Sequence, residues 1–133
     1  MAITQGAHHL GLTVPNIDAT RDFFVNVLEF QQVGGKPDYP SYFLSDGTTL
    51  LTLWQATEPK TAVPFDRKTN IGLHHFAFKV DGVETLNAIH TKLKNTEGVE
   101  IEFAPELLGS GPTQHMMFYI PGGVRMELTA AVK

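Results

Sequence analysis

Two short segments of the chain share the same alternation of apolar and polar positions. Residues 9–14 read His-Leu-Gly-Leu-Thr-Val, and residues 75–80 read His-Phe-Ala-Phe-Lys-Val. Such alternation is typical of a half-buried β-strand, in which successive side chains point to opposite faces. The apolar residues of each segment are therefore expected to face a core. One histidine per segment, His9 or His75, is expected on the other face, beside small or polar neighbours.

Each predicted strand is followed by a helical pattern. Asn16 or Asp18 is a suitable N-cap, and an apolar stripe at helical spacing indicates a helix that ends near Leu28. The second helix is expected to start at Asp81-Gly82 and to bury one face that carries Val83, Leu86, His90 and Leu93. Gly98 is expected to close that helix, because a left-handed C-terminal cap favours glycine.

The rest of the chain reads as strands and loops. Strands are expected at 41–44 and 48–54, joined by the hairpin signal Asp46-Gly47, and at 99–103, 113–120 and 124–130. Residues 31–40 should contain a strand end and a loop, and residues 105–112 a loop. The polar stretch 55–72, which is broken by two prolines, reads as a linker.

The predicted elements therefore run strand-helix-strand-strand-strand, twice. The two copies align at a constant offset of 66 residues through the first strand and into the helix, a repeat of the kind that decides a fold. We expect an α+β fold in which two βαβββ modules, residues 6–54 and 73–130, form a single domain over residues 1–133. Their sheets are expected to curve around a shared cavity, with the helices on the outer faces.

Composition limits the partners. The net charge of -4 over 133 residues argues against nucleic acid or an anionic membrane as the main partner. The absence of cysteine excludes disulfides and thiolate chemistry. No basic n-region with an apolar h-region precedes the first strand, and no apolar run has transmembrane length. We expect a cytoplasmic protein with a small-molecule substrate.

The last predicted strand adds a carboxylate to the histidine face. By alternation, Arg125, Glu127 and Thr129 share that face. A buried lone charge is costly, so Glu127 needs a partner. Two imidazoles and one carboxylate, from His9, His75 and Glu127, can hold one face of a divalent metal and leave the other positions open. His8 and His74 are expected on the opposite faces, as structural or exposed residues.

These motifs resemble the vicinal oxygen chelate superfamily, which includes glyoxalase I, methylmalonyl-CoA epimerase, fosfomycin-resistance thiol transferases, bleomycin-resistance proteins and type I extradiol dioxygenases. The resemblance covers essentially the whole chain and lies in residues 9–15, 22–28, 75–80 and 118–128. It implies a metal bound by His9, His75 and Glu127, with iron, manganese, zinc or nickel as the ion. It also implies a homodimer, whose site lies within one chain or is shared between two.

Three positions depart from relatives in that superfamily. Glyoxalase I has a fourth ligand on the last strand of its first module, where this chain has Thr52, a poor ligand. Extradiol dioxygenases carry a tyrosine at the position of Met117, and the usual Asp before Pro121 is Ile120. Thr52 favours a three-ligand, dioxygenase-like enzyme whose substrate chelates the metal through adjacent oxygens, whereas Met117 argues against strict catechol cleavage. A glyoxalase I-like lyase or epimerase is the alternative, and a metal-free binding protein of the bleomycin-resistance type is another.

Several further side chains are candidates for the same face. Glu127 and His115 are the candidate catalytic residues, although His115 could equally be an ordinary hydrogen-bonded histidine. Lys79 and Arg125 could neutralise an anionic substrate or pair structurally with Glu127 or Glu102. The candidate substrate-binding residues are Thr13, Thr52, Lys79, Met117, Tyr119 and Arg125.

Overall fold

The computed structural model describes residues 1–131, which divide into two compact units at Ala62–Val63. The division falls inside the segment that the sequence assigns to the linker. Each unit holds one helix and one four-stranded sheet, and each is described by itself. Within residues 1–131, no helix has the length and apolar character needed to cross a membrane.

The first unit contains β1 (His9–Val14), α1 (Ile17–Asn26), β2 (Gln31–Lys36), β3 (Ser41–Ser45) and β4 (Leu50–Gln55). Its sheet has the order β1-β4-β3-β2. The first and last strands pair in parallel, and β3 pairs antiparallel with both of its neighbours. Strands β1 and β2 therefore run in the same direction, and α1 is the crossover between them. The result is one βαβββ module.

The second unit repeats this topology with β5 (Phe76–Val80), α2 (Val83–Lys94), β6 (Glu100–Leu107), β7 (Gln114–Tyr119) and β8 (Arg125–Ala130). Its sheet has the order β5-β8-β7-β6, again with one parallel pair between the first and last strands. The predicted α+β class and the repeated βαβββ pattern are therefore confirmed. The shared cavity stays a prediction.

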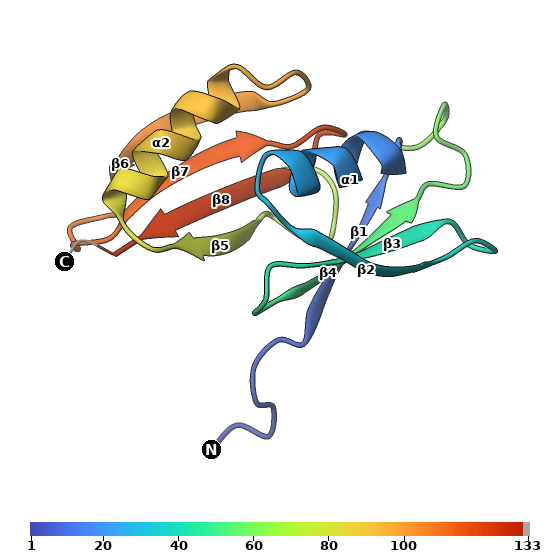
Figure 1. Ribbon diagram of the computed structural model, residues 1–133, viewed down its shortest axis with the longest axis horizontal. Helices are drawn as coiled ribbons and strands as arrows, with labels where there is room; N and C mark the ends of the chain where they lie inside the picture. Colours follow the sequence, from blue (N-terminus) through green and yellow to red (C-terminus); the bar gives the residue numbers. More distant parts are fainter. Residues whose placement is uncertain (132–133) are drawn as a thin grey trace. The chain divides into compact units, whose positions relative to one another are not determined.

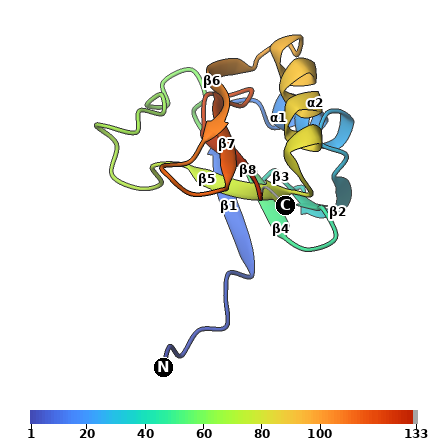
Figure 2. The ribbon, with the colours of Figure 1, turned by 90° about the vertical axis from the view of Figure 1, so that its left-hand side faces the viewer.

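Each helix buries an apolar face. In the first unit, α1 packs on β3 and β4, and the buried side chains include Phe24, Leu44, Leu51 and Leu53. In the second unit, α2 covers one face of its sheet (Figures 1 and 2). Its Leu86 and Leu93 are fully buried, as are Met116, Phe118 and Met126 of the strands. The opposite sheet face is thereby left for polar side chains.

The sequence predicted the start of α1 more accurately than the end of α2. Of the two predicted candidates, Asn16 caps α1, since its side chain accepts a hydrogen bond from the backbone N–H of Ala19 at 3.1 Å. The prediction that Gly98 closes the second helix is wrong, because α2 ends at Lys94 and Asn95 is its C-cap. Gly98 instead has a φ of +86° in the turn before β6, where a Cβ would lie 3.2 Å from the Pro121 ring.

Three strand bounds also differ from the sequence pattern. β2 occupies residues 31–36, where a strand end was expected, and has a register shift between Gln32 and Gly34. β6 continues through Pro105, which lies within the register shift between Phe103 and Glu106 of this edge strand, a position where proline is tolerated. β5 begins at Phe76, so His74 and His75 precede the strand.

Candidate functional site

Glu127 of β8 is the centre of the candidate site. Its neighbours along the strand, Met126 and Leu128, are buried at 0% and 2% exposure on the α2 side of the sheet. Glu127 points to the other face, yet it is only 7% exposed. A buried carboxylate needs hydrogen-bond or charge partners to offset its lost hydration.

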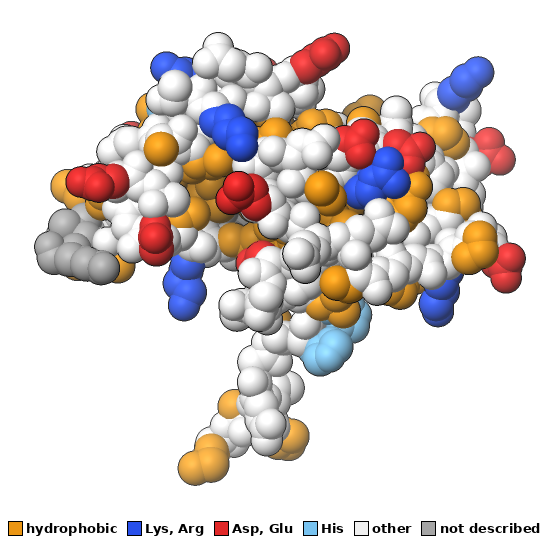
Figure 3. All heavy atoms as spheres, in the orientation of Figure 1, with side chains coloured by type: hydrophobic (Ala, Val, Ile, Leu, Met, Phe, Trp, Pro, Cys, Tyr) orange, Lys and Arg blue, Asp and Glu red, His pale blue; other side chains and the backbone are white. Residues whose placement is uncertain are grey.

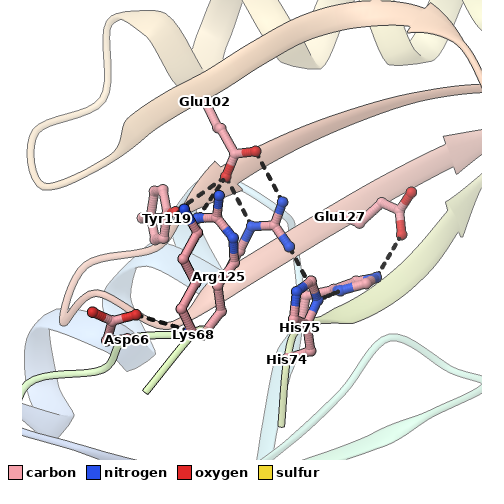
Figure 4. Close-up of polar contacts among 9 residues, drawn as sticks. Asp66, Lys68, His74, His75, Glu102, Tyr119, Arg125 and Glu127 are labelled. Carbon is pink, nitrogen blue, oxygen red and sulfur yellow. Dashed lines mark hydrogen bonds and ion pairs between the residues drawn. The ribbon is translucent and has the colours of Figure 1, made fainter. Parts of the chain in front are cut away.

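Two histidines supply these partners. His75 approaches from the segment before β5 and places its Nε2 3.1 Å from Oε1 of Glu127 (Figure 4). His115 approaches from β7 and places its Nδ1 2.5 Å from Oε2. The His115 ring also packs against Phe103, with ring centroids 4.9 Å apart. Glu127 is therefore held on both oxygens, and the more buried histidine makes the shorter contact.

His75 and Glu127 carry an imidazole nitrogen and a carboxylate oxygen, which are common ligands of divalent metals. Nε2 of His75 and Oε1 of Glu127 lie 3.1 Å apart, the separation of an ion pair or a hydrogen bond. Within residues 1–131, however, no three His, Asp or Glu side chains are placed so that they could hold a metal together. His115 contacts the other carboxylate oxygen, so the second unit offers two ligands.

His9, the third predicted ligand, belongs to the first unit. It is exposed at the start of β1, and its Nδ1 lies 2.9 Å from Nδ1 of His8. Figure 3 shows histidine side chains, in pale blue, exposed on the face in view. The imidazole of His9 is therefore accessible to solvent.

Thr52 shares the His9 face of the first sheet, because it pairs with Gly11 across β1 and β4. Its Oγ1 donates to the Leu10 carbonyl at 3.3 Å and accepts from Nε1 of Trp54 at 2.9 Å. These bonds satisfy the hydroxyl inside the protein. Thr13 lies further along β1 and is exposed.

A second polar cluster lies beside Glu127 on the same sheet. Arg125 is 6% exposed and donates from Nε and Nη2 to the two oxygens of Glu102, both at 2.8 Å. The Tyr119 hydroxyl donates to Glu102 at 3.0 Å. It accepts from Nη1 of Arg67 at 2.5 Å. The sequence left Glu127 and Glu102 open as ion-pair partners of Arg125, and in the structure the partner is Glu102.

This cluster shifts the acidity of its members. The Arg125 hydrogen bonds lower the pKa of Glu102 to about 2, and Tyr119 adds to that effect. The same bond raises the pKa of Arg125. Burial lowers the pKa of His74, and the Arg125 charge lowers it further. The cluster therefore keeps a fixed ion pair next to a neutral imidazole.

The remaining predicted residues are dispersed. Met117 is 4% exposed and pairs with Glu127 across β7 and β8. Lys79 is exposed on β5 and has no ion-pair partner within residues 1–131. A hollow of about 450 Å³ lies beside Tyr119 and is lined by Phe65, Asp66, Arg67, Lys68, Glu100, Tyr119 and Gly123.

Sequence reasoning missed Arg67, which lies in the segment read as a linker and gave no signal. It named Glu102 as one of two possible partners of Arg125, and the structure has Glu102 in that place. The prediction that His74 faces away from the site is wrong, because its Nδ1 contacts Nη1 of Arg125 at 3.2 Å. The strand period does not extend to a residue that precedes β5.

The family model described as the glyoxalase/bleomycin resistance protein/dioxygenase superfamily matches residues 6–128. The chain belongs to that superfamily. No curated protein sequence matches it. Within the superfamily, the similarity to solved structures shows the shared fold.

One such structure is a glyoxylase/bleomycin resistance protein/dioxygenase domain from Frankia sp. EAN1pec, with TM-score 0.83 and 20% identity over 98% of this chain and 94% of that chain. Another is the fosfomycin resistance protein FosX from Listeria monocytogenes, with TM-score 0.74 and 18% identity over 98% of this chain and 96% of that chain. A third is lactoylglutathione lyase from Agrobacterium tumefaciens, with TM-score 0.72 and 17% identity over 97% of this chain and 96% of that chain.

Proposed function

We propose that this glyoxalase-superfamily member is a metal-dependent enzyme in which His9, His75 and Glu127 bind one divalent cation. The observation that carries the proposal is the buried carboxylate of Glu127, whose Oε1 lies 3.1 Å from a histidine Nε2. Within residues 1–131 no Lys or Arg pairs with Glu127. A cation between Glu127 and His75 would supply the missing positive charge.

The donor set fits a three-ligand site. Two imidazoles and one carboxylate leave several metal positions for water or substrate. Thr52, whose hydroxyl is already bonded to Leu10 and Trp54, adds no fourth ligand. Such a cation would act as a Lewis acid on a substrate that binds through two adjacent oxygens. We favour a dioxygenase-like reaction and keep a glyoxalase-type lyase or epimerase as the alternative within the same site.

His115 completes the proposed machinery. Its Nδ1 faces Oε2 of Glu127 at 2.5 Å, and its ring is held against Phe103. It can orient the carboxylate and exchange a proton with it, which is the role of a general acid or base acting through Glu127. Glu127 and His115 are therefore the proposed catalytic pair.

The superfamily relationship also supports a homodimer with shared sites. His75 and Glu127 lie in the second unit and His9 in the first, so the third ligand must come from another unit. We propose that a partner chain can supply it. The first unit's Thr13 and Thr52 and the second unit's Lys79, Met117, Tyr119 and Arg125 are the candidate substrate-binding side chains.

Metal analysis of anaerobically purified protein tests the proposal. The wild type is expected to carry one metal per chain, and His9→Ala, His75→Ala and Glu127→Ala are each expected to lose it. His90→Ala on α2 is the matched control and should retain the metal. Iron would favour the dioxygenase-like reaction, and nickel or zinc the lyase. A wild type that binds no divalent metal would reject the enzyme in favour of a metal-free binding protein.

A further inference from the structure

The hollow beside Tyr119 lies wholly within the second unit, and the proposed metal site does not use it. Its volume is about 450 Å³, and two consecutive cations of the segment before β5, Arg67 and Lys68, line it. Arg67 is held at one corner of its guanidinium, because Nη1 donates to the Tyr119 hydroxyl and lies 3.4 Å from Oε1 of Glu102. A hollow with a fixed guanidinium in its wall is a candidate binding site.

The cluster around Glu102 carries one positive charge in excess. Arg125 donates to both oxygens of Glu102, at 2.8 Å each. These bonds hold the pKa of Glu102 at about 2, so the carboxylate is ionised at neutral pH. Arg67 is a second guanidinium on the same carboxylate, and it forms no other ion pair within residues 1–131. One anionic group of a ligand would balance the charge of the cluster.

Arg67 keeps hydrogen-bond donors for such a group. Its Nη1 is engaged by Tyr119 and Glu102, whereas its Nε and Nη2 have no hydrogen-bond partner in the described part of the chain. The side chain is 27% exposed, so a ligand can reach it. Lys68 adds an exposed ammonium that forms no ion pair within residues 1–131. Guanidinium and ammonium groups are the side chains with which proteins bind carboxylate and phosphate oxygens.

Two carboxylates also line the hollow and bear on its affinity for an anion. Asp66 and Glu100 are both exposed, and neither forms an ion pair within residues 1–131. Oδ1 of Asp66 accepts from the backbone N–H of Lys68 at 2.8 Å, so this carboxylate is turned toward its own segment (Figure 4). Because solvent screens exposed charges, the two acids weaken anion binding without preventing it.

We propose that this hollow binds one carboxylate or phosphate group of a small ligand through Arg67 and Lys68. Tyr119 ends β7, and its partner on β8 lies two residues, roughly 7 Å along the strand, before Glu127. This step rests on the proposed function: a substrate bound to the metal through adjacent oxygens can place an anionic group in the hollow. The substrate class is then a small organic anion, and binding of the anion itself needs no metal.

Titration of the metal-free protein with inorganic phosphate and with acetate, at constant ionic strength, tests the site. The readout is the set of backbone amide NMR shifts of residues 65–68, 119 and 123. We expect saturable shifts of these amides. A tighter response to phosphate would assign a phosphate group to the ligand, and a tighter response to acetate would assign a carboxylate.

Four variants give the expected pattern. Arg67→Met should weaken anion binding by about 10-fold, the usual effect of losing a charge-assisted hydrogen bond. Lys68→Met should also weaken it, and this side chain has no protein partner to lose, so the fold is kept. Glu100→Gln should strengthen binding, because a repulsive charge is removed. Lys60→Met, at an exposed lysine that does not line the hollow, should bind as the wild type does.

A wild type without saturable shifts would overturn the anion site. Equal affinity of the wild type and Lys68→Met, or equal losses in Lys68→Met and Lys60→Met, would also overturn it. A wild type that binds phosphate or acetate but no zinc would refute the proposed metal site and leave the hollow as an anion site. Zinc binding without any anion response would do the reverse.

Discussion

Glu127 has histidines on both of its oxygens, and substitution of each partner should have a different consequence. His75 offers Nε2, the nitrogen that our proposal assigns to the metal. His115 offers Nδ1 from a side chain that is 12% exposed and packed on Phe103. A buried carboxylate that loses one hydrogen bond keeps its desolvation cost, so His115 should matter even without touching the metal.

We predict that His115→Phe lowers zinc affinity by about 10- to 100-fold, because Oε2 of Glu127 loses the partner that orients it. His115→Asn should retain most of the affinity, since an asparagine amide can donate from a position close to that of Nδ1. Zinc titration by calorimetry measures both variants. Equal affinity of His115→Phe and the wild type would show that His115 does not support Glu127.

Glu102 gives a prediction about pH. Its pKa falls from 4.5 to about 2 in the folded protein, chiefly through Arg125. A lowered folded-state pKa adds stability above the unfolded value, and that stability is lost as the pH falls from 4.5 toward 2. Glu102→Gln should therefore be less stable at neutral pH and show a flatter loss over the acid range. Urea unfolding from pH 7 to pH 2 measures this, with exposed Glu97→Gln as control. Parallel curves for Glu102→Gln and the wild type would contradict the ion pair.

At the level of elements, alternation and helical spacing predicted the order of strands and helices and the core-facing residues. The same alternation placed the Glu127 side chain on the sheet face opposite to that of Met126 and Leu128. The strand alternation did not predict side-chain directions where the backbone departs from regular structure. β6 has register shifts around Phe103, and His74 precedes its strand. The Arg125–Glu102 pair and the His74 contact depend on those irregular segments, which carry no periodic signal.

The start of α1 provides a stability prediction. Asn16→Ala should destabilise the protein by about 0.5–2 kcal/mol, because the backbone N–H of Ala19 loses its cap. Asn87→Ala on the exposed side of α2 is the matched control. It should be neutral or slightly stabilising, since alanine is the better helix former. Thermal unfolding compares the two, and equal effects would argue against a cap at Asn16.

At the level of the whole molecule, the repeat separates the proposed ligands. One module carries His9, and the other carries His75 and Glu127. The sequence shows this distribution, but it contains no information about which modules meet. A single domain with one shared cavity, and the homodimer, therefore stay predictions.

Mixing two defective chains tests the dimer and the shared site together. His9→Ala and Glu127→Ala homodimers are each expected to lack metal. If the partner chain supplies His9, a mixed dimer contains one site with all three ligands and recovers one metal per dimer. Metal analysis of the mixture after refolding measures this. No recovery would place all three ligands in one chain, and a monomer by light scattering would reject the dimer.

The crystal structure of the zinc-loaded protein tests the central claim most directly. Our account predicts one zinc ion bound by Nε2 of His75, a carboxylate oxygen of Glu127 and an imidazole nitrogen of His9, each at roughly 2.0–2.2 Å. His115 should remain on the other oxygen of Glu127 without touching the ion. A zinc ion held by other residues, or a His9 side chain far from every Glu127 in the assembly, would contradict it.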